Sequence, residues 1–302
     1  VCFKQLANES QTIVGKKFRF HSIGTLQCAK KEGNAFPLHQ NSLTLLAKGL
    51  RTMLKRTFLA KNLKARLLIH RNHHLKTDMA KGKVDALLGI VFGDEGKGKV
   101  VDYFTPRYDV VARFAGGCNA GHTIIFDGKK FVLRSIPSGI FDESKINIIG
   151  NGCVIAPDLF MAEAQELEAA GYELTNRLHI SRRAHLILPT HRVLDRAYEA
   201  AKGKNKVGTT GKGIGPTYSD KAARVGLRVG DILHNFDEKY AALKARHEQI
   251  LRDLHYTDYD LTEEEERWLK GVEYMRKFNL TDTEYEINHA LAEGKNVLAE
   301  GA

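Results

Sequence analysis

The sequence predicts an α/β fold with a mostly parallel central sheet and an added helical subdomain. Apolar runs at 84–92, 108–113 and 146–149 have the length and composition of strands. Helical segments follow them, and the chain becomes mostly helical after Asp231. Strands that alternate with helices are typical of parallel sheets.

A glycine-rich loop follows the first of these strands, which reads as apolar on both faces. The loop is Gly93-Asp94-Glu95-Gly96-Lys97-Gly98-Lys99, and a helix is expected from Val100 to Phe104. The glycines allow a tight turn that brings N–H groups to an anion, and a helix N-terminus favours negative charge. The spacing therefore predicts a phosphate loop like that of P-loop NTPases, with a solvated Gly/Lys turn as the alternative.

The phosphate loop lacks one expected group. Val100 stands where a P-loop carries a Ser or Thr hydroxyl for magnesium. A magnesium ligand must therefore come from elsewhere, and Asp94 within the loop is the candidate.

The next elements are read from turn and capping residues. Asp127-Gly128 is a favoured hairpin turn between strands at 124–126 and 130–133. Pro157 and Gly171 bracket a helix, and Thr190 is expected to cap the following one. Short strands are expected at 178–180 and 184–188.

The last part of the chain predicts three helices and a strand. Apolar residues from Phe236 to Leu254 keep the i, i+3/i+4 spacing of one amphipathic helix. Thr262 with Glu265, and Thr283 with Glu286, predict capping boxes. An apolar strand then runs from 296 into a glycine-containing loop. Because a compact domain rarely ends by opening a strand and turn, the sequence is expected to be cut short.

Two further loops combine small residues with groups that reach a ligand. In Asn119-Ala120-Gly121-His122-Thr123, small residues let the backbone approach a ligand while His122 contacts it. The alternative is a histidine satisfied by a neighbouring carbonyl. The stretch 208–218 holds four glycines, three threonines and a lysine. It is either a second anion cradle or a flexible surface loop.

The positive charge is confined to the N-terminal segment. Residues 1–78 carry fifteen Lys/Arg against three acids, whereas 79–302 carry thirty-one against thirty-three. The charge therefore gives no argument for nucleic-acid binding by the whole chain. The segment reads as a transit peptide, a nucleic-acid arm, or upstream sequence without a selected fold. Met79 favours the last, so 1–78 is expected to be unstructured or artefactual, and 79–302 to be the domain.

The cysteines and the hydropathy of the sequence indicate the cellular compartment of the protein. Cys2, Cys28, Cys118 and Cys153 have neither CxxC pairing nor His partners at metal spacing, so free thiols in a reducing compartment are expected. No apolar run approaches the roughly 18 residues of a membrane span. A cytoplasmic protein without a membrane partner is predicted.

Together, the three glycine-containing loops resemble the three signatures of adenylosuccinate synthetase, in that family's order and at about its spacing. The stretches 134–139 and 188–192 fit the same pattern. The resemblance runs from about Met79 to Ala302 and does not extend to residues 1–78.

The resemblance implies a GTP- and magnesium-dependent ligase that joins IMP and L-aspartate, giving adenylosuccinate, GDP and phosphate through 6-phosphoryl-IMP, the first committed step of AMP synthesis. Asp94 would take the proton from N1 of IMP, and would hold magnesium together with the Gly121 carbonyl. His122 would be the acid, and Lys97 would hold phosphate. A homodimer is implied in which Arg224 reaches the IMP phosphate across the interface.

The resemblance also assigns two overlapping binding sets. GTP would contact Gly93, Asp94, Glu95, Gly96, Lys97, Gly98, Lys99, Gly121, His122 and Thr123. IMP would contact Asp94, Glu95, Gly96, Lys97, Asn119, Ala120, Gly121, His122, Thr210 and Arg224.

Three departures from the family pattern are visible. Lys212 stands where many members carry arginine, and Cys118 where proline or histidine is usual. Family members also continue past Ala302 into segments that bind aspartate and guanine, so little or no activity is expected from this chain alone.

Two other functional classes compete with the ligase. A P-loop GTPase switch is disfavoured by Val100 and by the lack of a Lys-Asp guanine motif in a suitable place. A nucleic-acid-binding protein would depend on residues 1–78 alone.

Overall fold

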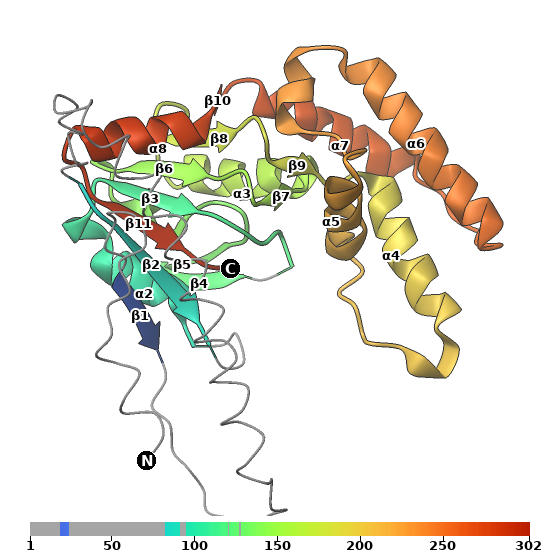
Figure 1. The fold of residues 1–302 in the computed structure, drawn as a ribbon, viewed down its shortest axis with the longest axis horizontal. Coiled ribbons are helices and arrows are strands. Elements are labelled where there is room, and N and C mark those ends of the chain that lie inside the picture. The colour runs from blue at the N-terminus through green and yellow to red at the C-terminus, as the bar shows by residue number, and fades with distance from the viewer. Residues whose placement is uncertain (1–18, 24–81, 91–94, 120, 127) are drawn as a thin grey trace, which may run out of the picture. The chain divides into compact units, whose positions relative to one another are not determined.

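The protein was analysed as a computed structural model. It describes residues 19–23, 82–90, 95–119, 121–126 and 128–302 (Figure 1). For 19–23 and Phe126 only the backbone is described. Gly93, Asp94, Ala120, Cys2 and Cys28 lie outside the described residues, as do Met79 and most of residues 1–78. The division into two domains at Met79 therefore stays a prediction.

Among the described residues, seven strands form one sheet in the order β1-β2-β11-β3-β6-β8-β10, and every neighbouring pair is parallel (Figure 1). The strands are β1 (Arg19–Ile23), β2 (Val84–Gly89), β3 (Val110–Arg113), β6 (Ile146–Ile149), β8 (Leu178–Ser181), β10 (Asn279–Thr281) and β11 (Val297–Glu300). The predicted parallel sheet is confirmed. β2 differs from the prediction because its residues alternate between half-buried and buried, instead of being buried on both faces.

The last strand, β11, lies inside the sheet between β2 and β3. Its Glu300 is in register with Leu87 of β2 and Arg113 of β3. Parallel strands end at the same edge of a sheet, where open α/β sheets bind their ligands. The predicted strand near the end of the chain is therefore confirmed, and its terminal residue lies at this edge.

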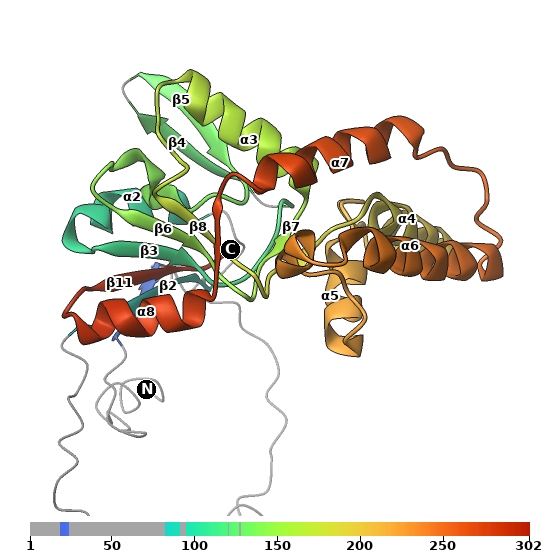
Figure 2. The same ribbon diagram turned by 90° about the horizontal axis from the view of Figure 1, so that it is seen from above.

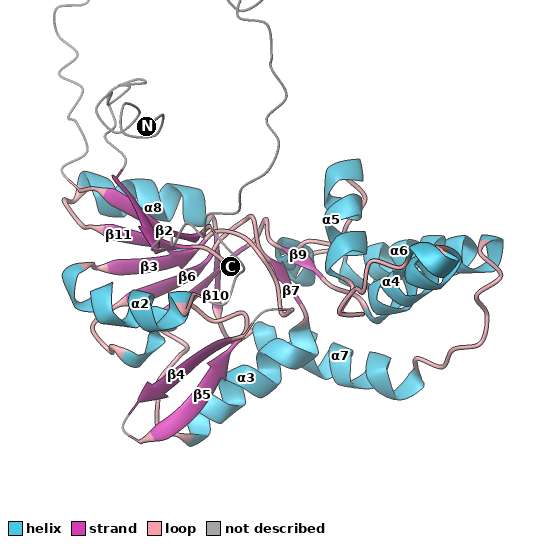
Figure 3. Ribbon diagram, turned by 90° about the horizontal axis from the view of Figure 1, so that it is seen from below, coloured by secondary structure: helices cyan, strands magenta, loops and turns pink. Residues whose placement is uncertain are grey.

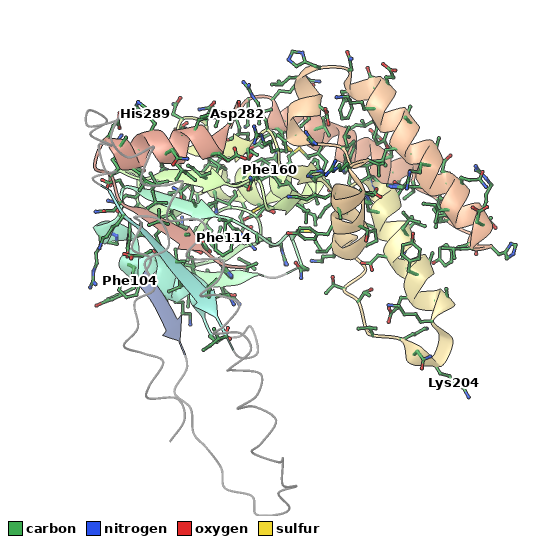
Figure 4. The ribbon with its side chains drawn as sticks, viewed as in Figure 1. Phe104, Phe114, Phe160, Lys204, Asp282 and His289 are labelled. Atoms are coloured by element: carbon green, nitrogen blue, oxygen red, sulfur yellow. The ribbon has the colours of Figure 1, made fainter. Side chains whose placement is uncertain are left out.

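Helices cover both faces of the sheet, as Figure 3 shows. On one face, α2 (Lys97–Phe104) packs Val101 with Val111 of β3. On the other, α8 (Thr283–Ala292) packs Leu291 with Ala112 of β3. Because successive side chains of a strand point to opposite faces, one short strand supplies both contacts. Figure 4 labels Phe104 at the end of α2 and His289 on α8.

The largest hydrophobic core among the described residues packs a second layer of elements onto the sheet. This layer contains α3 (Pro157–Ala169), α7 (Thr262–Met275) and the antiparallel hairpin of β4 (His122–Phe126) and β5 (Lys129–Leu133). The fully buried Trp268 of α7 donates its indole N–H to the Ile187 carbonyl over 2.7 Å. Phe160 of α3, labelled in Figure 4, packs edge-on against Phe278 with ring centroids 5.2 Å apart. The predicted hairpin is confirmed.

The predicted helical subdomain is also present. Helices α4 (Pro189–Ala201), α5 (Ile214–Ala223) and α6 (Phe236–Asp253) gather beside the sheet in Figures 1 and 2. The remaining elements are β7 (Val154–Ile155), β9 (His185–Leu186) and the 3₁₀ helices η2 (Thr105–Arg107), η3 (Ser138–Phe141), η4 (Gly203–Asn205) and η5 (Val229–Leu233). None of the helices in the described part of the chain is long and apolar enough to cross a membrane.

The predicted caps are wrong, although the helices begin close to the expected positions. Thr190 lies inside α4, and its hydroxyl pairs with Nδ1 of His247 at 2.6 Å. Glu265 of α7 instead accepts hydrogen bonds from Lys244, and Glu286 of α8 pairs with His179. Partners from other elements therefore take the groups that local capping would have used.

Candidate functional site

The predicted phosphate loop leads into α2 earlier than expected. Gly96 has φ +77°, a left-handed conformation that glycine adopts without strain, and α2 begins at Lys97 rather than Val100. The helix therefore starts inside the glycine-rich loop, so its N-terminus belongs to the loop itself. A helix N-terminus presents N–H groups and positive potential to an anion.

Gly98 brings α2 directly against the second motif. A Cβ at Gly98 would lie 2.6 Å from the Cβ of His122, the first residue of β4. Only a residue without a side chain permits this approach. The structure therefore joins the first two sequence motifs, which the chain separates by a strand and a loop.

Lys97 and Glu95 form a buried pair at the end of β2. The Lys97 ammonium donates to Glu95 Oε2 over 3.3 Å, and the two side chains are 4% and 7% exposed. A Cβ at Gly89 would meet Glu95 Oε2 at 2.5 Å and Lys97 Nζ at 2.9 Å. The pair therefore lies over the last residue of β2, at the carboxyl edge of the sheet.

His122 contacts a carboxylate that the sequence motifs do not include. Its Nδ1 lies 2.7 Å from Oε1 of Glu300, the last residue of β11, which is fully buried. Ser138, the first residue of η3, donates its hydroxyl to Oε1 over 2.7 Å and its N–H to Oε2 over 2.8 Å. Both carboxylate oxygens are thus held.

The charge state of Glu300 follows from these contacts. Burial opposes ionisation, but the hydrogen bond and charge of His122, the charge of Arg113 and the Ser138 N–H outweigh it. They hold the pKa of Glu300 below its ordinary value. Glu300 is therefore an ionised acceptor at neutral pH.

The second ring nitrogen of His122, Nε2, differs from Nδ1 in its hydrogen bonding. Nε2 of His122 is buried and has no hydrogen-bond partner among the described residues. A buried polar atom of this kind needs an explanation, and an absent ligand is one. The alternative of a histidine satisfied by a carbonyl is wrong, because a carboxylate binds one ring nitrogen and the described structure leaves the other without a partner.

Arg113 ends β3 beside Glu300. Its side chain is 1% exposed, and Nη1 donates to the Arg134 carbonyl. Its Nη2 is buried without a partner in the described part of the chain. The loop after β3 begins at Phe114, which Figure 4 labels, and leads to the His122 motif.

The stretch before η3 is fixed by Glu163 of α3. Its carboxylate accepts N–H groups from Arg134, Ser135 and Ile136 at 2.8–3.2 Å. Burial raises the pKa of Glu163 to about 7, although the hydrogen bonds from these three N–H groups act to lower it. This backbone cradle positions the turn that carries Ser138.

The third motif joins the site through main-chain contacts. Lys212 donates to the Cys118 carbonyl over 3.2 Å, and Gly213 N–H donates to Asp195 Oδ2 over 2.9 Å. Tyr218 of α5 accepts the Gly116 N–H over 3.0 Å. The 208–218 stretch is thus linked to the loop that precedes His122.

Several of the remaining predicted site residues lie at the protein surface. Asn119, Gly121, Thr210 and Arg224 are exposed. Arg224 directly follows the last residue of α5, has φ +62° and lines a cavity of about 430 Å³. Other cations on that cavity are Arg228, Lys239 and Arg246. The contacts therefore bring together Gly98, His122 and Glu300, while Thr210 and Arg224 belong to the helical subdomain.

No sequence motif assigned a role to Glu300, Arg113 or Ser138, although Ser138 lies in the stretch 134–139 that fits the family pattern. Glu300 and His122 are 178 positions apart, so no local spacing relates them. The available signal was an acidic residue ending an apolar strand, because such a residue lies at the carboxyl edge of a parallel sheet.

One group of three potential metal ligands occurs among the described residues: His191, Asp220 and His247. The Leu188 N–H donates to Nδ1 of His191 over 2.9 Å, so the ring proton of neutral His191 is on Nε2, 3.0 Å from Asp220. Burial lowers the pKa of His191 to about 4, which keeps it neutral. Because a metal-bound nitrogen must be unprotonated, the group fits a hydrogen-bonded link between α4, α5 and α6.

Comparisons with known proteins agree on one family. The family model for adenylosuccinate synthetase matches residues 86–302. The adenylosuccinate synthetases of Phocaeicola vulgatus and Bacteroides fragilis are each 69% identical over 220 residues, which is 73% of this chain and 52% of each relative. The fully ligated adenylosuccinate synthetase from Plasmodium falciparum is 37% identical with a TM-score of 0.64, over 72% of this chain and 51% of that one. The chain spans about half the length of the curated relatives it matches.

Proposed function

Since the chain belongs to the adenylosuccinate synthetase family, we propose that it takes part in the GTP-dependent condensation of IMP with L-aspartate. The products are adenylosuccinate, GDP and phosphate. The observation that carries the proposal is His122, whose Nδ1 is held by Glu300 while Nε2 is buried without a partner in the described structure.

The first step is phosphoryl transfer to IMP. Asp94 takes the proton from N1 of IMP, O6 forms a bond to the γ-phosphorus of GTP, and the bond from that phosphorus to GDP breaks. His122 donates a proton from Nε2 to a phosphate oxygen. Because such transfers leave little covalent work to the protein, positioning and charge stabilisation lower the barrier.

The second step uses the 6-phosphoryl-IMP made in the first. The aspartate amine forms a bond to C6, the bond from C6 to the phosphate oxygen breaks, and the amine loses a proton that balances the charge of the departing phosphate. Water would hydrolyse this intermediate, so the site must exclude it. The buried setting of His122 and Glu300 supports this requirement.

The proposed phosphate contacts cluster at the start of α2. Lys97 and the glycine-rich loop hold the GTP phosphates, which fits a helix N-terminus that begins inside this loop. Thr123 borders GTP, and Asn119 and Thr210 contact IMP.

Magnesium is assigned to Asp94 and the Gly121 carbonyl. The donor set fits this ion, since Mg²⁺ takes oxygen ligands and leaves room for substrate phosphates. Gly121 is exposed directly before His122, and a Cβ there would lie 2.9 Å from Val132 Cγ1, so any larger residue would force the Val132 side chain to shift. When bound, the ion would neutralise phosphate charge. This chain's residues orient the phosphate and move the protons.

A homodimer is proposed in which Arg224 reaches the IMP phosphate of the partner's site. Arg224 lines a cavity with Arg228, Arg246 and Lys239, the last paired with the Asp231 carboxylate on the same cavity, and the excess of guanidinium groups suits a phosphate. Buried free thiols at Cys118 and Cys153 support a cytoplasmic location, where thiols stay reduced.

The proposal is tested by two assays of the purified chain. The first follows adenylosuccinate formation from IMP, GTP, aspartate and magnesium. The second omits aspartate and measures IMP-dependent scrambling of ¹⁸O between the bridging and non-bridging positions of GTP, which reports 6-phosphoryl-IMP formation alone.

The variant is His122→Asn and the matched control is His289→Asn, whose side chain on α8 is 77% exposed. General acid catalysis contributes at least about 100-fold, so His122→Asn should lose this factor in both assays while the control keeps its rate. Because this chain alone is expected to form little adenylosuccinate, the second assay decides: a chain that binds GTP but gives no IMP-dependent scrambling would refute the ligase and favour a nucleotide-binding regulator.

A further inference from the structure

We infer that Asp220 is a positioning residue for the proposed reaction: its carboxylate anchors the end of α5 and so holds Arg224 where the guanidinium can reach the IMP phosphate. This inference deepens the proposed function and rests on it. Asp220 acts through Arg224 and touches no substrate itself.

The end of α5 depends on polar contacts for its position. The buried residues of this helix are Pro216 and Thr217, which lie in its first half. At the other end, Ala222, Ala223 and Arg224 are exposed, so their side chains bury little apolar surface. The direction in which Arg224 leaves the helix is therefore set by hydrogen bonds.

The Asp220 carboxylate joins α5 to both neighbouring helices. Its Oδ2 lies 3.0 Å from Nε2 of His191 on α4 and 2.7 Å from Nε2 of His247 on α6. Burial opposes ionisation of Asp220, but the hydrogen bonds from the two rings outweigh it and hold the pKa of Asp220 below its ordinary value. Asp220 is therefore an ionised acceptor that two N–H donors share.

The two imidazoles that hold Asp220 are themselves fixed. Both are fully buried, and their ring centroids lie 4.5 Å apart. The Leu188 N–H donates to Nδ1 of His191 over 2.9 Å, and the Thr190 hydroxyl pairs with Nδ1 of His247 at 2.6 Å. Neither ring can turn without losing a hydrogen bond, so Asp220 is bound to a rigid frame.

The main chain of Asp220 closes the turn that carries Arg224. Its carbonyl accepts the N–H groups of Val225 and Gly226 at 3.0 and 3.2 Å. These bonds enclose Arg224 in its left-handed conformation, φ +62°. A Cβ at Gly226 would lie 3.4 Å from the Cβ of Asp220, so the chain returns directly against this residue. The side chain of Asp220 thus fixes α5, and its carbonyl fixes the backbone of Arg224.

A second polar contact holds the same turn from another side. Lys221, the next residue, donates to the Asn151 carbonyl. This contact is to a loop and does not involve α4 or α6. Because it remains when the Asp220 carboxylate is removed, we expect α5 to stay folded in Asp220 variants while the orientation of its end becomes less defined.

The first test is amide hydrogen exchange of the unsubstituted chain and of Asp220→Ala. Alanine is the strongest helix former, so faster exchange would not come from helix propensity. Residues 220–226 should exchange about tenfold faster or more, as expected for the loss of a hydrogen bond to a charged group, while α3 keeps its rate. Asp220→Asn, which keeps an acceptor oxygen without the charge, should show a smaller change. Unchanged exchange at 220–226, or equal acceleration in α3, would overturn the inference.

The second test compares the KM values for IMP and GTP in the ¹⁸O scrambling assay. Asp220→Ala should raise the KM for IMP by about tenfold or more, because a guanidinium contact to phosphate is weakened, and leave the KM for GTP unchanged. Asp220→Asn should recover part of the loss. The matched control is Glu286→Gln, which removes the carboxylate beside His179 on α8 and should change neither KM. An equal rise in both KM values of Asp220→Ala would show a purely structural role and overturn the inference.

A double variant tests whether Asp220 acts through Arg224. Arg224→Gln alone should raise the KM for IMP, and adding Asp220→Ala should raise it no further, since two residues that act as a unit are not additive. Additive increases would contradict the inference. If the unsubstituted chain gives no IMP-dependent scrambling, the proposed function fails, and hydrogen exchange still decides whether Asp220 fixes the turn at Arg224.

Discussion

The ammonium group of Lys212 donates a hydrogen bond to the main-chain carbonyl of Cys118 over 3.2 Å. From the resemblance, both residues are expected to depart from the family pattern. They come from different loops, and their contact connects the stretch before α5 to the loop that leads into His122. The two departures therefore form a single local contact.

Lys212→Met should loosen this connection. A hydrogen bond from a charged donor contributes about 1.5–3 kcal/mol, so we expect a loss of about 1–2 kcal/mol in the free energy of unfolding, measured by urea titration. Under the proposed function, the KM for IMP should rise as well, because Thr210, a proposed IMP contact, lies in the same loop. The control is Lys204→Met, at the exposed turn after α4 that Figure 4 labels. An equal loss in both variants would rule out a specific link.

The buried histidine His191 should make folding stability sensitive to acid. Burial lowers its pKa to about 4, whereas an unfolded histidine titrates near 6.5. Between these values the unfolded chain binds a proton that the folded chain does not. Stability should therefore be complete above about pH 6.5 and fall by about 3 kcal/mol as the pH drops to about 4.

Urea unfolding at several pH values measures this dependence. His191→Gln should make the slope shallower, and His185, whose pKa burial and the charges of Lys221 and Arg228 lower to about 4, should account for part of the remainder. The exposed His289→Gln should keep the original slope. An unchanged slope in His191→Gln would contradict the prediction.

Gly271→Ala should separate α7 from α3. A Cβ at Gly271 would overlap the Pro157 carbonyl carbon, and this contact is main chain that cannot move aside. Overpacking of this kind costs about 1–3 kcal/mol, visible as a lower urea midpoint. Gly215→Ala is the matched control, because a Cβ there meets open space in α5. It should be neutral or slightly stabilising; equal destabilisation of both variants would mean that the loss does not come from this contact.

Gly98→Ala should push α2 away from His122. The added Cβ would lie 2.6 Å from the Cβ of His122, so the helix N-terminus must shift relative to β4. We expect GTP affinity, measured by calorimetry, to fall by about tenfold or more, which corresponds to about 1.4 kcal/mol. Gly215→Ala again serves as control, and unchanged GTP affinity in Gly98→Ala would contradict the proposed phosphate site.

Most of the sheet could be predicted from local patterns. The strands at 110–113, 146–149 and 297–300 were expected from apolar runs, and the Pro157 helix from its Pro and Gly boundaries. Such elements depend on periodicity and backbone preference, which neighbouring residues determine. The predicted cap at Thr190 failed because its hydroxyl pairs with the distant His247, and the one at Thr262 failed because its hydroxyl donates to Asp260, two residues before it.

The candidate site likewise contains residues that local motifs predict and residues that only the tertiary fold brings into place. His122 and Lys97 stand in recognisable motifs, whereas Glu300 matters only because β11 inserts between β2 and β3. Register between strands far apart in sequence has no local signature. Asp94, the expected base, lies outside the described residues, so its role stays a prediction.

The central position of β11 has a consequence for how the chain acquires its structure. β2 and β3 are close in sequence but cannot pair with each other, since the strand between them is made some two hundred residues later. During synthesis the sheet stays open until residues 297–300 leave the ribosome, and closing so long a loop slows folding. Insertion of β11 and arrival of the Glu300 carboxylate beside His122 are one event, so the candidate acid gains its carboxylate partner only once β11 has been made.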